Sequence, residues 1–178
     1  MSIDFDALKN SINSISTCVQ QFSELKDVNV KLLLAGIPIV FVSIEKNKKG
    51  HVKEVAKNLF SDAAFACVKM LIFLEHTMDI SDIADAVWRF SNNFDPRRDH
   101  FDFPSQNEIE VNHVAYDGTR KLKEFDDFHR DWPNILVSDQ KTIERVDAIW
   151  DKLGLGKFIK SPSLKYSQQL YKGGAVAE

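Results

Sequence analysis

Residues 38–46 read PIVFVSIEK, and this short run decides the fold class. Its β-branched and aromatic side chains have few polar breaks, which is typical of a strand that is buried on both faces. Residues 68–74, VKMLIFL, form a second run of the same kind. Strands of this type need helices on both sides of the sheet. The two runs therefore predict an α/β fold.

A helical segment connects the two strands. The charged turn KNKKGH at residues 46–51 leads into a helix whose inward residues are Val52, Val55, Ala56, Leu59 and Phe60. A strand, a helix-length crossover and a second strand favour parallel pairing in a right-handed βαβ unit. We expect an α/β fold (α+β in some schemes) with a mixed, partly parallel sheet that helices flank.

The segments around this unit have their own signals. Apolar residues at spacings of three and four predict an N-terminal packing helix over residues 3–25. Ser81 or Asp82 can cap a helix with Ile83, Val87, Phe90 and Phe94 on one face, which Pro96 ends. We expect residues 101–133 to be mostly loop with one edge strand, in the stretch NEIEVNHVAY at residues 107–116.

A last helix begins at Ser138 or Asp139 and closes at Gly154, a left-handed cap. Beyond it the apolar residues are too sparse for a core. We therefore predict one α/β domain over residues 1–158 and an extended tail over residues 159–178, which either contacts a neighbouring subunit or is disordered.

Composition excludes several classes of function. The chain has 23 basic and 26 acidic residues in 178, a formal charge of −3, so it lacks the positive excess that nucleic-acid binding needs. No window is apolar enough for a transmembrane segment, and the N-terminus lacks the pattern of a signal peptide. Cys18 and Cys67 have apolar neighbours and no metal-ligand spacing, which indicates buried, reduced thiols in a cytoplasmic protein.

Few residues combine into a constellation that could carry chemistry. The stretch LGLGKF lacks the first glycine and the final Ser or Thr of a phosphate loop, and no GxGxxG follows either strand. Glu75 and His76 stand at the C-terminal end of a predicted strand, where α/β sheets place their sites. One acid and one imidazole do not define a catalytic site, so we interpret both as structural or cleft-lining.

Two charged turns are the other candidates. Arg97 and Arg98 can form bidentate pairs with neighbouring acids such as Asp99 and pin the turn after the helix. Asp117 and Arg120 lie in a second polar turn, DGTRK, which can play the same structural role or meet an anionic group. These two interpretations of the second turn stay open at the level of the sequence.

Four ordered motifs resemble one family. They are IVFVSIEKNKKGHVKEVA, VKMLIFLEHTMDISDIADAVWRFSNNFDPRRD, AYDGTRK and RDWPN with TIERVDAIWDKLGLG, and they run from about Ile37 to Gly156. Together they are similar to the C-terminal domain of the UbiD-type decarboxylases, the carboxy-lyases of ubiquinone biosynthesis and aromatic-acid metabolism. Members of this family are much longer and carry a preceding split-barrel domain.

The resemblance implies a role for this chain. The preceding domain of the family binds prenylated FMN and metal ions and holds the catalytic residues, and nothing here matches it. We therefore assign no catalytic, cofactor-binding or metal residue to this chain and expect no cofactor in it. The implied partners are a flavin-binding domain of the same or a companion chain, and further copies in a homo-oligomer. The C-terminal domain would help to close the active-site cleft.

The resemblance also places Trp88 inward, so that it packs its helix onto the sheet. Its replacement by alanine would then cost about 3 to 5 kcal/mol. Two rival hypotheses remain at this stage. One is a free-standing oligomerisation module that has the fold without the flavin domain, and the other is an unrelated small enzyme that acts at Glu75 and His76.

Overall fold

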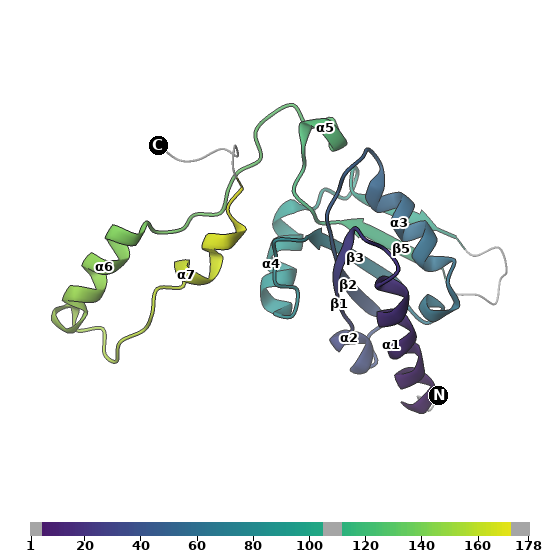
Figure 1. Cartoon of the computed structure of the whole chain (residues 1–178), viewed down its shortest axis with the longest axis horizontal. Helices are drawn as coiled ribbons and strands as arrows, with labels where there is room; N and C mark the ends of the chain where they lie inside the picture. Colours follow the sequence, from purple (N-terminus) through teal and green to yellow (C-terminus); the bar gives the residue numbers. More distant parts are fainter. Residues whose placement is uncertain (1–4, 105–111, 172–178) are drawn as a thin grey trace. The chain divides into compact units, whose positions relative to one another are not determined.

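The computed structural model describes residues 5–104 and 112–171, with the backbone alone at residues 5–11 (Figure 1). The chain divides into two compact units, Met1–Arg130 and Asp131–Glu178. The first unit holds the sheet, and the second is helical.

Five strands form one mixed sheet in the order β1-β2-β3-β5-β4. The inner strands β2, β3 and β5 run parallel, while β1 and β4 pair antiparallel at the two edges. Their bounds are β1 (Leu25–Asn29), β2 (Ile39–Ile44), β3 (Met70–Glu75), β4 (His100–Phe103) and β5 (His113–Asp117). This arrangement confirms the predicted α/β fold with a partly parallel sheet.

Apolar side chains cover both faces of this sheet. In β2, Val40 and Val42 face one core together with helices α1 and α3, while Phe41 faces a second core beside α4. This alternation follows from the two-residue period of a strand. The helices of the unit are α1 (Phe5–Val19), α2 (Lys31–Leu34), α3 (His51–Phe60), α4 (Ile83–Asn93) and α5 (Lys123–Asp126), with a 3-10 turn at Ala63–Phe65.

The crossover helix α3 buries the face that the sequence predicts. Val52, Val55, Ala56 and Leu59 are each at most 2% exposed. Gly50 precedes the helix with φ +66°, a left-handed conformation that glycine adopts without steric cost. The glycine therefore turns the chain from the loop after β2 into α3.

The region after α4 differs from the prediction. We expected mostly loop with one edge strand, but β4 and β5 are both present, and β5 lies inside the sheet between β3 and β4. The apolar signal is weak because Asp117 and two ring-bearing polar residues, His113 and Tyr116, interrupt it. Residues 107–111 of the predicted strand NEIEVNHVAY lie outside the described part of the chain.

Helix α4 confirms only part of the predicted inward face, since Ile83 and Phe90 pack against the second core. Asp82 caps it by accepting hydrogen bonds from Ala84 N and Asp85 N, as expected. However, Trp88 is 49% exposed and Val87 is 46% exposed. The helix packs through the small side chain of Ala86, and position 88 lies about 200° around the axis from it. The inward placement of Trp88 and Val87 was therefore wrong.

The two cysteines also differ from each other. Cys18 is buried, and burial together with the nearby Asp62 raises the pKa of its thiol to about 11. Cys67 is exposed in the turn before β3, so its predicted burial was wrong. Its position beside a turn explains this, because a short apolar neighbourhood does not fix which side chains point inward.

The second unit contains α6 (Gln140–Ile149), a 3-10 turn (Trp150–Leu153), α7 (Ser163–Tyr166) and a final 3-10 turn (Ser167–Gln169). Asp139 caps α6, and Gly154 has the left-handed conformation, φ +65°. The Asn134 side chain donates to Tyr171 O at 2.7 Å and accepts from Tyr171 N at 2.8 Å, which ties the ends of the unit together. No helix in the described residues is long and apolar enough to cross a membrane.

The exposure of Trp88 gives a first test of the fold. We predict that Trp88→Ala lowers the free energy of unfolding by only about 1 kcal/mol, because it removes half-exposed surface and a contact with Arg89. The matched variant Phe73→Ala removes a fully buried ring from β3 and should cost about 3 to 5 kcal/mol. Urea denaturation measures both, and equal losses would contradict the placement of α4.

Gly118, directly after β5, gives a second test. A Cβ atom there would lie 2.9 Å from Phe90 Cδ2 and 3.1 Å from the Phe73 carbonyl oxygen. We therefore predict that Gly118→Ala destabilises the unit by about 1 to 3 kcal/mol through overpacking. Thermal unfolding of Gly118→Ala beside the exposed-site control Asn92→Ala measures this, and an equally high melting temperature for both would refute it.

Candidate functional site

Charged side chains gather at the carboxyl ends of the parallel strands. Lys46 follows β2, Glu75 ends β3 and Asp117 ends β5. Open α/β sheets bind their ligands at this edge. The carboxyl edge of the sheet is therefore the candidate functional site.

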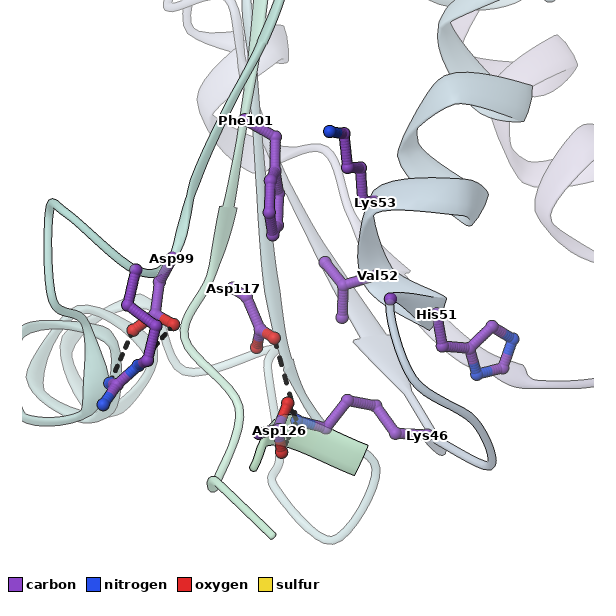
Figure 2. Close-up of a pocket in the computed structure, with 10 residues that line it drawn as sticks. Lys46, His51, Val52, Lys53, Asp99, Phe101, Asp117 and Asp126 are labelled. Carbon is purple, nitrogen blue, oxygen red and sulfur yellow. Dashed lines mark hydrogen bonds and ion pairs between the residues drawn. The ribbon is translucent and has the colours of Figure 1, made fainter. Parts of the chain in front are cut away.

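A cavity of about 160 Å³ lies at this edge (Figure 2). The N-terminus of α3 forms one wall, and the ends of β4 and β5 form another. Its lining residues are Lys46, Gly50, His51, Val52, Lys53, Arg98, Asp99, Phe101, Asp117 and Asp126. Three carboxylates and three cationic side chains thus share one small space.

Lys121 connects two of the predicted site residues. Its ammonium group lies 2.9 Å from Asp117 Oδ1 and 3.2 Å from Asp99 Oδ1, and it donates to the Asp117 carbonyl oxygen at 2.7 Å. The Lys121 side chain is only 1% exposed. Thr119 adds two hydrogen bonds to Asp117 Oδ1, from its backbone N–H and its hydroxyl. The turn DGTRK therefore folds back onto its own first residue.

Lys46 makes the corresponding connection from β2. Its ammonium group donates to both oxygens of Asp126, at 2.8 and 2.7 Å, and to the Arg120 carbonyl oxygen at 3.0 Å. It also lies 3.7 Å from Asp117 Oδ2. Figure 2 shows Lys46 and Asp126 below Asp117 in this arrangement. Lys46 thus fixes the segment of α5 against the edge of the sheet.

The turn after α4 joins the same network through Arg98. Its guanidinium group donates to Asp99 Oδ1 at 2.8 Å and to Asp99 Oδ2 at 2.7 Å, a bidentate pair. Asp99 Oδ2 also accepts from Asp95 N at 2.8 Å, and Asp117 N donates to the Asp99 carbonyl oxygen at 2.9 Å. Arg97 and Arg98 are both exposed. They differ in that the Arg98 guanidinium is held by the Asp99 carboxylate.

The charges of this network balance. Asp99, Asp117 and Asp126 face the cations Lys46, Arg98 and Lys121. Burial alone would raise the pKa of Asp117, but Lys121 and Lys46 hold it below its usual value of 3.8. The carboxylate stays ionised near neutral pH and is a poor proton donor. The described residues contain no cluster that could hold a metal ion.

Glu75 and His76 do not form a joint site. Glu75 lies 3.4 Å from Arg89 Nε of α4, and its other oxygen accepts from Arg120 N at 3.3 Å. His76 is exposed, and its backbone N–H donates to Ile44 O. The acid and the imidazole therefore face different surroundings. The Arg89 guanidinium also lies 5.4 Å from the centre of the Trp88 ring.

The sequence indicated Asp99 with its partner Arg98, and it placed Asp117 and Lys121 in one charged turn. Lys46 and Asp126 are the residues of the network that it did not indicate. Lysine side chains are usually exposed to solvent, so the sequence offered little reason to expect a buried one. The position of Lys46 close after the buried strand β2 was the only available signal. The pairing of Lys46 with Asp126 spans 80 residues, which no local pattern reveals.

The residues of this cavity do not fit a flavin. Its volume of about 160 Å³ is well below the ~300 to 1,000 Å³ that is typical of cofactor pockets. Its three carboxylates, Asp99, Asp117 and Asp126, are also already paired with lysine or arginine side chains. We therefore derive no chemical step through a flavin from these residues.

The buried network makes a stability prediction. Lys121→Met would leave Asp99 and Asp117 short of a cation in a buried site, so we expect a loss of about 3 to 5 kcal/mol in unfolding free energy. Lys49→Met is the control, because the Lys49–Asp127 pair is exposed on both sides and its loss should change the unfolding free energy little. Chemical denaturation compares them, and similar small losses would contradict a tight network.

The unfolding free energy should depend on pH through the carboxylate of Asp117. The pKa of Asp117 is lower in the folded state than its usual value of 3.8, so its contribution to stability is present above that pH and is lost as the pH falls below it. We predict a shallower loss of unfolding free energy below about pH 4 in Asp117→Asn than in the parent chain. Identical slopes would mean that Asp117 is not perturbed by the two lysines.

Comparisons with known proteins show the family of this chain. The sequence model of the 3-octaprenyl-4-hydroxybenzoate carboxy-lyase C-terminal domain matches residues 7–122. An uncharacterized protein of Archaeoglobus fulgidus is 26% identical, over 73% of this chain and 29% of its own length. One from Aquifex aeolicus is 30% identical, over 65% of this chain and 25% of its own length. The chain thus spans under a third of these relatives.

Solved structures share the fold. Vanillic acid decarboxylase of Sedimentibacter hydroxybenzoicus in its open form has a TM-score of 0.55 at 17% identity, over 80% of this chain and 32% of its own. An evolved dimeric form of the UbiD-class enzyme HmfF from Pelotomaculum thermopropionicum, in complex with prFMN, has a TM-score of 0.51 at 19% identity, over 87% and 29%. Since the family match covers most of the sheet-bearing unit, this chain belongs to the UbiD C-terminal domain family.

Proposed function

We propose that this chain acts as the C-terminal domain of a UbiD-type decarboxylase. The complete enzyme would release the carboxylate of an aromatic or unsaturated acid as carbon dioxide. Prenylated FMN, which would supply the electron sink, and metal ions would bind in a flavin domain of the same or a companion chain. The family match over residues 7–122 carries this proposal. We further propose ubiquinone biosynthesis, in the cytoplasm, as the setting of this enzyme.

The charge network supports a structural role for this domain in that enzyme. Asp99 and Asp117 are both held by Lys121, so neither is a free acid or base. A paired network fixes the loops at the carboxyl edge of the sheet without taking part in proton transfer. This fits a domain that borders an active site and leaves the chemistry to another domain.

Cleft closure and assembly are the finer parts of the proposal. Tryptophan is enriched among the residues that contribute most to protein interfaces, and on α4 Trp88 is 49% exposed. One structural neighbour with the same fold is a dimeric form of its enzyme. We therefore expect the outer face of α4 to contact either the flavin domain or another copy in a homo-oligomer.

The test starts from the native polypeptide. An antibody raised against this chain would recover the protein from the source cells, followed by mass spectrometry and a carbon dioxide assay with vanillate and a 3-prenylated 4-hydroxybenzoate. We expect a flavin-binding domain in the recovered material, on the same or a second polypeptide, and carbon dioxide release that depends on prenylated FMN. The free-standing module predicts a self-associating 20.3 kDa chain without such a domain, and this result would overturn the proposal.

A further inference from the structure

The second unit displays an exposed apolar loop. Every residue from 151 to 160 is exposed, although the stretch LGLGKFIK within it contains four large apolar residues. Leu155 is 63% and Ile159 is 66% exposed, and Leu153 and Phe158 are nearly half exposed. Apolar groups gathered in this way mark an interaction surface when they lie in an ordered segment.

The loop has a defined shape. Trp150 Nε1 donates to the Gly156 carbonyl oxygen at 3.0 Å, and the Trp150 ring meets the Phe158 ring edge to face, with 5.6 Å between centroids. Gly154 and Gly156 have positive φ angles of 65° and 84°, which favour glycine at both positions. The display of apolar side chains is therefore built into the loop.

The charge of the loop is mainly positive, since Asp151 at its start is its single acidic residue. Lys152, Lys157 and Lys160 are exposed within it, and Lys165 follows. No acidic residue occurs from Lys152 to Lys172 in the sequence. Residues 131–178 hold 7 basic and 6 acidic residues, whereas residues 1–130 hold 16 basic and 20 acidic ones. Among the described residues, the three loop lysines make no ion pair, so their charge is available.

We propose that this loop docks on the surface of an anionic lipid bilayer. Leu155, Phe158 and Ile159 would enter the boundary between headgroups and acyl chains, while the lysines contact lipid phosphates. Long lysine side chains place their stems along apolar surface and their charges in the headgroup layer. The combination of aliphatic and aromatic tips with lysines is the pattern of segments that lie in a membrane interface.

A protein partner fits this loop less well. The buried centres of protein interfaces are depleted in lysine, because each ammonium group would lose its water. Here a lysine lies within two residues of each of Leu153, Leu155, Phe158 and Ile159. A bilayer accepts this arrangement since the charged ends stay in the headgroup layer. Binding through one loop is reversible and weakens as salt screens the lysines.

Vesicle sedimentation with the whole chain tests this inference. We expect binding to vesicles of mixed phosphatidylglycerol and phosphatidylcholine, little binding to phosphatidylcholine alone, and release by sodium chloride. Lys157→Gln with Lys160→Gln should lower the partition coefficient at least tenfold, because each lysine near the surface contributes about fivefold. Ile159→Ser should also lower it, since it removes an inserted side chain.

Matched variants in the first unit serve as controls. Lys57→Gln with Lys69→Gln makes the same change of net charge at two exposed lysines, and Leu34→Ser removes an apolar side chain that is 48% exposed. Both should leave the partition coefficient within twofold of the parent chain. Absent binding, or equal losses in the loop and control variants, would overturn the proposal. So would a dimer, seen by analytical ultracentrifugation without lipid, that Ile159→Ser converts to monomer.

Discussion

The ammonium group of Lys121, held between Asp99 and Asp117, is the interaction on which the first unit most depends. It joins the turn after α4 to the end of β5, and Lys46 extends the connection to α5. Buried charges are costly alone and tolerable when paired, so each member of this network needs the others. The parallel strands can therefore end in charged loops without leaving the core open.

This network also explains which parts of the fold the sequence could reveal. The strands β2 and β3 were predictable because nearly all of their side chains are apolar. In β5, the residue that ends the strand is Asp117, which is buried for its charge pairing and so weakens the apolar pattern. In α4 the inward residues include Arg89 and Asn93, while Trp88 faces outward. The apolar spacing thus placed Ile83 and Phe90 correctly and Val87 wrongly, and the family resemblance placed Trp88 wrongly.

The candidate site shows the same limit. Asp99 and Asp117 could be found because they lie in short charged turns beside predicted elements. The pair of Lys46 with Asp126 could not be found in this way, since the two residues are 80 positions apart in the sequence. The carboxyl edge of the sheet is held by paired charges and borders a small cavity. An edge of this kind suits a domain that positions neighbouring loops, which is the part we propose for it in a larger enzyme.

The second unit differs from the first in how little apolar surface it buries. Ile143, 6% exposed, is the only large apolar residue that is buried among its described residues, so the unit gains little stability from a core of its own. Its exposed apolar side chains can therefore bind the surface of another body. The neighbouring lysines favour an anionic surface. The net charge of −3 for the chain does not oppose this, because acidic residues further than about 8 Å from a bilayer are screened at physiological salt. The local charge of the loop, and not that of the whole chain, decides the attraction.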